Sequence, residues 1–157
     1  MAQQHDEDAR RDAARESITQ GRATLGIELG STRIKAVLVG EDHVPLASGV
    51  HAWENQFVDR TCTYSLDAVW EGLRAAVAEL LDDAERTHGV RPTSLAAIGV
   101  SAMMHGYLAF DADGDLLVPF RTWRNTSTGP AAAELTELLG YNIPLRWSVA
   151  HLYQAVL

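Results

Sequence analysis

The sequence is nearly free of cysteine, with only Cys62 among its 157 residues. A single thiol cannot form a disulfide within the chain, and it cannot supply a cysteine-based metal site. Scarcity of cysteine is typical of proteins in reducing compartments. The N-terminus also lacks the apolar core of a secretory signal. We therefore predict a cytoplasmic protein.

Long apolar runs, basic clusters and the common nucleotide-binding motifs are also missing. No apolar run approaches the length that spans a bilayer. The net charge is -8, and no Lys/Arg cluster is suited to neutralising phosphates, which argues against a nucleic-acid partner. Neither G-x-x-x-x-G-K-[ST] nor G-x-G-x-x-G occurs, so a P-loop or Rossmann site is not indicated. We predict no membrane and no nucleic-acid partner.

What is present is enough for one core, because 46% of the residues are hydrophobic. Residues 1–22 form a polar extension of mixed charge. Its few apolar residues recur near helical spacing, and Gly21 stands where a helix would end. We predict a short helix over about 7–20, with a frayed tail as the alternative.

Strand and helix patterns alternate over the first two thirds of the chain. Short connections between apolar segments 24–30, 34–40 and 46–53 predict an antiparallel meander. A helix opens at Ser65, carries an apolar stripe and ends at Gly89. The stripe consists of Leu66, Val69, Trp70, Leu73, Val77, Leu80 and Leu81. Small apolar residues at 95–102 predict a strand that is parallel to the sheet and buried on both faces.

The C-terminal third combines a hairpin pattern with two helices. Asp113-Gly114 predicts a turn between strands at 107–111 and 116–120. The spacing predicts a helix over 130–139. The helical pattern at 149–157 is still running at the last residue, which suggests a cut through a longer protein. Its apolar face favours self-association, for example as a homodimer.

The first stretch that carries candidate functional residues is LGIELGSTRIK, residues 25–35. A tight turn of Gly30, Ser31 and Thr32 offers backbone N–H groups and hydroxyls to anionic oxygens. Gly30 would permit close approach and a positive φ. Glu28, inside the first strand, suits Mg²⁺, and Lys35 adds a positive charge. The alternative is an ordinary hairpin with a polar turn.

The second stretch is Met103-Met104-His105-Gly106, just past a strand, where open α/β sheets place ligand loops. His105 can hydrogen-bond a ligand hydroxyl, and Gly106 frees backbone for close contact. The alternative is a structural histidine. A calcium loop starting at Asp111 is rejected, because the positions that need Gly and Glu hold Leu116 and Thr122.

The third stretch is Trp123-Arg124-Asn125-Thr126. An indole beside amide and hydroxyl groups is a plausible platform for a sugar. A capped turn explains the same residues without a ligand.

These stretches, in this order, resemble the N-terminal part of the FGGY family of carbohydrate kinases, nearest to xylulokinase-type members. The family's first motif reads like I-G-I-D-L-G-T-S-x-x-K, and here it is LGIELGSTRIK. A later segment reads like G-I-x-x-Q-M-H-G, followed by P-x-x-x-W-x-D. Here that segment is IGVSAMMHGYLAFDADGDLLVPFRTWRN. The resemblance runs from about Leu25 to about Asn125.

The resemblance implies an actin-like, ribonuclease-H-like α/β domain, with an antiparallel meander, then parallel strands, and flanking helices. It implies transfer of the γ-phosphate of ATP to a sugar or polyol hydroxyl with Mg²⁺. The resemblance also implies that the ATP phosphates are bound by Gly30, Ser31, Thr32 and Lys35. It implies that Glu28 is associated with the metal. Met104, His105, Gly106, Trp123 and Asn125 line the sugar pocket.

The chain departs from the family pattern at three of these positions. Glu28 and Asn125 replace aspartates, and Met103 replaces a glutamine. The family's general-base Asp lies beyond Leu157. We therefore expect residues 23–157 to be an incomplete N-terminal kinase domain, inactive alone. The alternative is a standalone carbohydrate-binding or regulatory module without catalysis.

Overall fold

The computed structural model describes residues 2–157, and for residues 2–4 and 6–8 it describes only the backbone. The chain divides into two compact units. The sheet unit comprises the residues up to Trp53 together with Val69–Ala102. The loop–helix unit comprises Glu54–Ala68 and Met103–Leu157. None of the helices in the described part of the chain has the length and apolar content needed to cross a bilayer.

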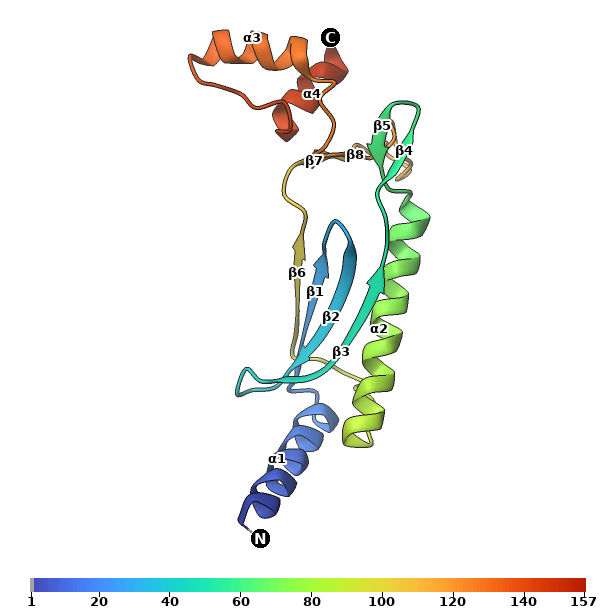
Figure 1. The fold of residues 1–157 in the computed structure, drawn as a ribbon, viewed down its shortest axis with the longest axis vertical. Helices are drawn as coiled ribbons and strands as arrows, with labels where there is room; N and C mark the ends of the chain where they lie inside the picture. Colours follow the sequence, from blue (N-terminus) through green and yellow to red (C-terminus); the bar gives the residue numbers. More distant parts are fainter. Residues whose placement is uncertain (1) are drawn as a thin grey trace. The chain divides into compact units, whose positions relative to one another are not determined.

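The sheet unit is built on a four-stranded mixed sheet in the order β3-β2-β1-β6 (Figure 1). Its strands are β1 (Thr24–Leu29), β2 (Arg33–Val39), β3 (Pro45–Ala52) and β6 (Ala97–Ala102). β1 and β3 are antiparallel to β2, whereas β6 is parallel to β1. The predicted meander followed by a parallel strand is confirmed.

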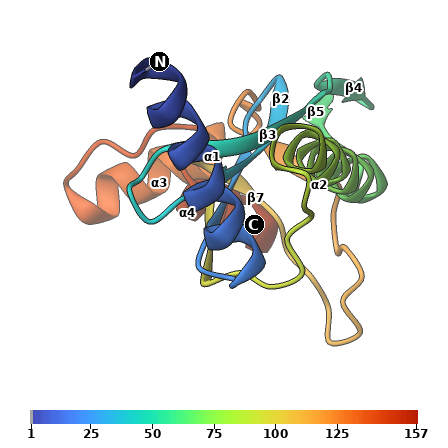
Figure 2. The same cartoon turned by 90° about the horizontal axis from the view of Figure 1, so that it is seen from below.

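Helix α2 (Leu66–His88) covers one face of this sheet, and Figure 2 shows it nearly end-on beside β3. Small residues allow the close approach. A Cβ on Gly49 would lie 2.0 Å from the Ala76 carbonyl oxygen, and one on Gly72 would lie 2.7 Å from Ile34 Cδ1. The predicted apolar stripe is therefore partly wrong. Trp70 is 54% exposed, and the buried face is made by Gly72, Ala76, Leu80 and Ala84.

The ends of α2 follow local rules. Ser65 Oγ accepts a hydrogen bond from the Ala68 N–H at 3.1 Å, which satisfies one of the free donors of the first turn. Gly89, just past the helix, has φ of 69°, a conformation that favours glycine. Both predicted helix ends are confirmed.

Strand β6 is the main departure from the prediction for this unit. All six of its residues are exposed, so the prediction of a strand buried on both faces is wrong. The reason is its position: β6 is an edge strand whose partner among the described residues is β1. Composition predicted burial on both faces, but burial depends on the elements that cover those faces.

A helix precedes the sheet, as predicted, but α1 spans Ala2–Thr19 and so begins earlier than the predicted 7–20. Two residues of its last turn are buried, with Ser17 at 5% and Ile18 at 1% exposure. Gly21 follows with φ of 66°, in agreement with the predicted helix end.

The loop–helix unit contains two short hairpins. β4 (Gln56–Val58) pairs with β5 (Thr61–Thr63) through a turn at Asp59 and Arg60, whose φ values of 46° and 65° are left-handed. The sequence did not predict this hairpin, because such turns usually carry Gly or Asn. The second hairpin pairs β7 (Gly106–Tyr107) with β8 (Arg121–Thr122).

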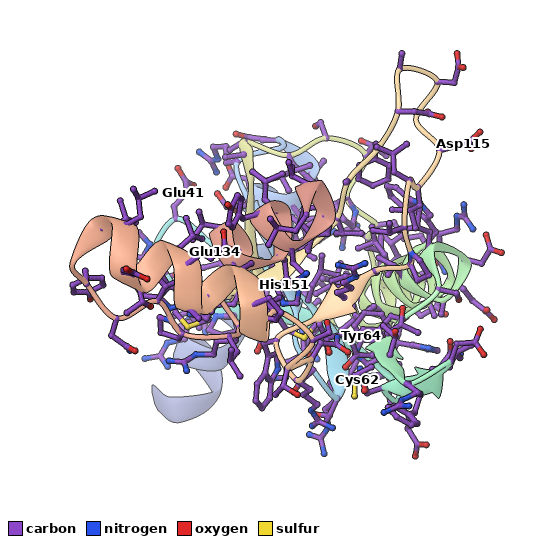
Figure 3. All side chains as sticks on the ribbon, turned by 90° about the horizontal axis from the view of Figure 1, so that it is seen from above. Glu41, Cys62, Tyr64, Asp115, Glu134 and His151 are labelled. Atoms are coloured by element: carbon purple, nitrogen blue, oxygen red, sulfur yellow. The ribbon has the colours of Figure 1, made fainter. Side chains whose placement is uncertain are left out.

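The strands predicted at 107–111 and 116–120 are wrong in extent. Between β7 and β8 there is only a single bridge, Phe110 to Leu116, and the turn that contains Asp115 (Figure 3). Asp111 Oδ1 accepts hydrogen bonds from the N–H groups of Asp113 and Asp115. A side chain that takes up these backbone donors competes with a strand ladder. The predicted turn is present, but the strands around it are not.

Two helices complete the loop–helix unit: α3 (Gly129–Leu139) and α4 (Ser148–Val156). They pack through a cluster of Ala132, Leu135, Ile143 and Ala150. The hydroxyl of Tyr153 on α4 donates to Glu134 Oε2 on α3 at 2.6 Å, and Figure 3 labels Glu134. Gly140 ends α3 with φ of 61°. Both predicted helices are confirmed.

Candidate functional site

The corner between β1 and β2 is a tight turn. The Gly30 N–H donates to the Arg33 carbonyl oxygen at 3.0 Å. A Cβ on Gly30 would lie 2.9 Å from the same oxygen, so the close approach requires glycine. The predicted positive φ at Gly30 is wrong, because the turn closes with Gly30 outside the left-handed region. Glycine is needed here for space.

Trp53, just after β3, holds this corner from one side. Its indole Nε1 donates to the Gly30 carbonyl oxygen at 2.8 Å. Its backbone N–H donates to the Thr32 carbonyl oxygen at 3.1 Å. Trp53 is 9% exposed. Sequence reasoning missed this residue; the signal available was a tryptophan at the end of the third strand.

Glu28 and Lys35 are directly opposite each other on β1 and β2. Lys35 Nζ lies 3.0 Å from Glu28 Oε2, and the two side chains are 42% and 51% exposed, respectively. Within residues 2–157, no group of three or more His, Cys, Asp or Glu side chains is placed to hold a metal ion. Glu28 is therefore a single carboxylate with a lysine partner, and it does not form a protein-only metal site.

A shallow hollow of about 450 Å³ lies over the sheet and includes this ion pair in its lining. The lining consists of Gly26, Ile27, Glu28, Lys35, Val37, Gly99, Val100 and Ser101. The corner residues Gly30, Ser31 and Thr32 lie outside that lining. The hollow is thus lined by residues of the adjacent strands β2, β1 and β6, and its surface has both polar and apolar side chains.

In the loop–helix unit, the backbone is unusual where the chain enters β7. His105 has φ of 62° and Gly106 has φ of 123°. A non-glycine residue with left-handed φ is strained and is often associated with functional sites. The His105 ring stacks on Trp147 with centroids 6.2 Å apart. Ser148 Oγ donates to the Gly106 carbonyl oxygen at 2.9 Å, so the start of α4 holds the loop.

Met104, the other predicted residue of this loop, is 74% exposed. Its neighbours His105 and Gly106 are half-buried. Trp147 and Ser148 were not predicted as site residues, because nothing local in the sequence pairs them with residues about 42 positions earlier. The structure thus brings the predicted His105 and Gly106 together with two unpredicted residues.

His151 on α4 (Figure 3) lies beside this loop and is fully buried. Its ring stacks on Tyr107 with centroids 6.3 Å apart. Neither ring nitrogen has a hydrogen-bond partner within the described part of the chain. Burial, and to a smaller extent the positive charge of Arg121, lower the pKa of His151 below its ordinary value. The ring is therefore held in the neutral form near pH 7.

Trp123 and Asn125 lie in different surroundings. Trp123 is 42% exposed, and the Arg124 guanidinium lies over its ring at 5.4 Å from the centroid. Asn125 is 6% exposed. Its Oδ1 accepts from the Cys62 N–H at 2.9 Å, and its Nδ2 donates to the carbonyl oxygens of Cys62 and Thr122 at 2.8 and 2.9 Å. Both amide donors are thus used by backbone, which leaves one Oδ1 lone pair.

Comparison with known proteins agrees with the architecture. The sequence pattern of the N-terminal domain of the FGGY family of carbohydrate kinases matches residues 23–147. The match contains all three stretches, from Leu25 to Thr126. The comparison with curated protein sequences gives no match. The chain belongs to the FGGY family of carbohydrate kinases.

Solved structures share this fold. A xyloylose kinase from Brucella ovis is 23% identical with a TM-score of 0.70, over 83% of this chain and 28% of that chain. A xylulose kinase from Rhodospirillum rubrum is 22% identical with a TM-score of 0.62, over 74% and 23%. A Plasmodium falciparum glycerol kinase, solved with ADP, is 13% identical with a TM-score of 0.63, over 82% and 27%. The chain therefore spans about a quarter of these proteins' lengths.

Proposed function

We propose that this chain is the N-terminal portion of an ATP-dependent carbohydrate kinase that phosphorylates a hydroxyl of a sugar or polyol. The observation that carries the proposal is the family match over residues 23–147, which includes both the β1–β2 corner and the His105 loop. Two of the structural neighbours are kinases of xylulose and glycerol, and one was solved with ADP.

In this proposal the sheet unit binds the nucleotide phosphates. The hydroxyls of Ser31 and Thr32 and the backbone around them face anionic oxygens, with Lys35 nearby. The Gly30 N–H is bonded to the Arg33 carbonyl oxygen, so Gly30 contributes by allowing the tight turn. Mg²⁺ commonly uses one or two carboxylates together with waters and substrate phosphates. Glu28 supplies one such carboxylate once Lys35 moves to a phosphate. The bound ion would neutralise phosphate charge.

The loop–helix unit binds the sugar in this proposal. His105 and the half-buried Gly106 offer a ring nitrogen and backbone groups to hydroxyls, and Met104 supplies exposed apolar contact. Trp123 offers a partly exposed indole face. Asn125 contributes mainly by holding the segment, because its amide is bonded to the backbone of Cys62 and Thr122.

The chain alone is expected to be inactive. Phosphoryl transfer requires in-line positioning of the hydroxyl and the γ-phosphate. The resemblance implies that the general-base Asp of the family is not among residues 1–157. A second candidate, a carbohydrate-binding module without catalysis, is favoured by one observation: the acid proposed for the metal is already paired with Lys35.

The test is sugar-dependent ADP release, measured over a panel of pentoses, hexoses and polyols. The 157-residue chain and the longest reading frame that contains it are compared. We expect release only from the longer protein. Turnover by the chain alone would contradict the predicted inactivity, and absence of turnover in both, together with sugar binding, would support the binding module.

A matched pair of glycine variants tests the corner in the longer protein. Gly30→Ala places a Cβ 2.9 Å from the Arg33 carbonyl oxygen, whereas Gly129→Ala meets nothing within 4 Å. We expect Gly30→Ala to raise the KM for ATP and Gly129→Ala to leave it unchanged. An unchanged KM for ATP in Gly30→Ala would count against the corner as a phosphate site.

A further inference from the structure

The indole of Trp147, the residue just before α4, lies against the imidazole of His105. Their ring centroids are 6.2 Å apart and the ring planes differ by 19°. This spacing and angle are typical of offset-stacked aromatic rings. Both residues are half-buried, so neither is sealed inside the core. They are far apart in the sequence, and only the folded loop–helix unit brings the two rings together.

Trp147 is itself held firmly in place. Its N–H donates to the Pro144 carbonyl oxygen at 3.1 Å, and its own carbonyl oxygen accepts from the N–H groups of Ala150 and His151 at 3.0 and 3.2 Å. The indole packs against the apolar cluster between α3 and α4. The ring of Tyr141 also lies against it, with centroids 6.1 Å apart. The loop–helix unit therefore presents the indole as a fixed flat surface.

What the backbone does not fix in His105 is the plane of its ring. The backbone has φ of 62°, and Ser148 Oγ holds the carbonyl oxygen of the next residue, Gly106, at 2.9 Å. The imidazole can still turn about its side-chain torsions. The stack against the indole limits that rotation, because it holds one face of the ring. The two ring nitrogens lie in the ring plane, so the stack itself does not use their capacity to bond hydroxyl groups.

We propose that Trp147 is a positioning residue for sugar recognition, which holds the His105 ring in the plane that directs its nitrogens at the sugar hydroxyls. The inference rests on the proposed function, in which His105 binds the sugar. The competing explanation is that Trp147 only fills space beside the cluster of α3 and α4. The two explanations differ in what they require at position 147. Positioning needs a flat aromatic ring, whereas filling space needs only apolar volume.

The first measurement uses the isotope-labelled 157-residue chain and does not require kinase activity. Aromatic ¹³C relaxation gives the order parameter of the His105 ring in the parent chain, in Trp147→Phe and in Trp147→Leu. We expect a rigid ring in the parent and in Trp147→Phe, and a more mobile ring in Trp147→Leu. A ring that is equally ordered in all three chains would overturn the positioning role. Should Trp147→Leu fail to fold, as judged by circular dichroism, Trp147→Met replaces it, because methionine adapts to irregular apolar space.

The second measurement is the steady-state kinetics of the longer protein. Loss of the stack in Trp147→Leu is expected to raise the KM for the sugar about two- to tenfold and to leave the KM for ATP unchanged. Trp147→Phe keeps an aromatic ring and should retain most of the parent's affinity for the sugar. Trp70→Leu, the same substitution at an exposed position of α2, should change neither KM. Equal increases in Trp147→Phe and Trp147→Leu would show that position 147 supplies only volume, which would overturn the proposal.

A double-mutant cycle with His105→Asn distinguishes failure of this inference from failure of the proposed function. Asparagine tolerates the left-handed φ of this position. Because Trp147 acts through the imidazole, Trp147→Leu should add little to the KM for the sugar once His105→Asn is present. An unchanged KM for the sugar in His105→Asn alone would overturn sugar binding by His105, and the inference with it. A raised KM in His105→Asn, without any rise in Trp147→Leu, would overturn only the positioning by Trp147.

Discussion

The indole Nε1 of Trp53 donates a 2.8 Å hydrogen bond to the carbonyl oxygen of Gly30, and the Trp53 backbone N–H bonds to the Thr32 carbonyl. One residue thus holds carbonyls on two sides of the same turn. The end of the third strand therefore fixes the corner between the first two strands. The conformation of the candidate phosphate-binding corner therefore depends on β1, β2 and the residue that follows β3.

Trp53→Phe tests this relationship. The variant keeps a buried aromatic ring but removes the donor to Gly30. We expect the free energy of unfolding to fall by about 1–2 kcal/mol, because a partly buried carbonyl loses its partner. Amide hydrogen exchange at Ser31 and Thr32 should become faster. Urea unfolding and exchange measured by NMR give the two quantities.

Trp70→Phe is the matched control for that prediction. The Trp70 indole is 54% exposed, so the same chemical change should alter stability by no more than about 0.5 kcal/mol. It should leave exchange at the corner unchanged. Equal effects of both variants would show that the hydrogen bond to Gly30 has no special importance.

The features that sequence predicted are those set by local chemistry. Alternating apolar residues and short connections predicted the meander of β1, β2 and β3. The capping serine at Ser65 and the glycines Gly89 and Gly140 predicted where helices begin or end. Each of these depends on interactions within a few residues of the chain, which the sequence displays directly.

The features that sequence missed depend on distant partners. The bond from Trp53 spans 23 residues, and the bonds between Asn125 and Cys62 span 63. No local pattern pairs those residues. The exposure of β6 was missed for a related reason, because a small apolar strand looks the same whether or not other elements cover it.

Asn125→Asp restores the residue type that the resemblance expects at this position. An aspartate can accept from the Cys62 N–H, but when ionised it cannot donate to the carbonyl oxygens of Cys62 and Thr122. Two carbonyls, that of Thr122 buried and that of Cys62 partly buried, lose their donor and face a negative charge. We expect the free energy of unfolding to fall by about 2–4 kcal/mol, measured by urea unfolding.

The control for this change is Asn142→Asp, the same substitution at an exposed position. Its effect should stay within about 0.5 kcal/mol. If Asn125→Asp lowered the free energy of unfolding no more than Asn142→Asp does, the hydrogen bonds of the Asn125 amide to Cys62 and Thr122 would not be important for stability. Its role would then be sought in ligand binding, as the family resemblance implies.

Ser148→Ala tests the support of the His105 loop and rests on the proposed kinase function. The variant removes the 2.9 Å bond to the Gly106 carbonyl oxygen. In the complete kinase we expect the KM for the sugar to rise about three- to tenfold, with the KM for ATP unchanged. Steady-state kinetics measures both, with Ser48→Ala as the control. Equal increases in both KM values would indicate a general loss of structure.

The pH dependence of stability tests the buried ring of His151. Its pKa in the folded chain is lowered by burial, with a smaller effect of Arg121, from an ordinary value of 6.5. Above that pH the ring is neutral in both states, and stability is unaffected. As the pH falls below 6.5, the unfolded chain takes up a proton that the folded chain resists. The free energy of unfolding should therefore decrease toward acid pH.

His151→Phe removes this linkage while keeping a ring against Tyr107. The histidine contributes a slope that approaches about 1.4 kcal/mol per pH unit below its unfolded pKa. The variant should therefore lose less stability than the parent chain between pH 7 and pH 5. His43→Asn is the control, because His43 is exposed and asparagine tolerates its φ of 63°. Carboxylates titrate alike in all three proteins, so the difference between curves isolates the histidine. Identical curves for the parent chain and His151→Phe would mean that the ring takes up its proton as readily in the folded chain as in the unfolded one.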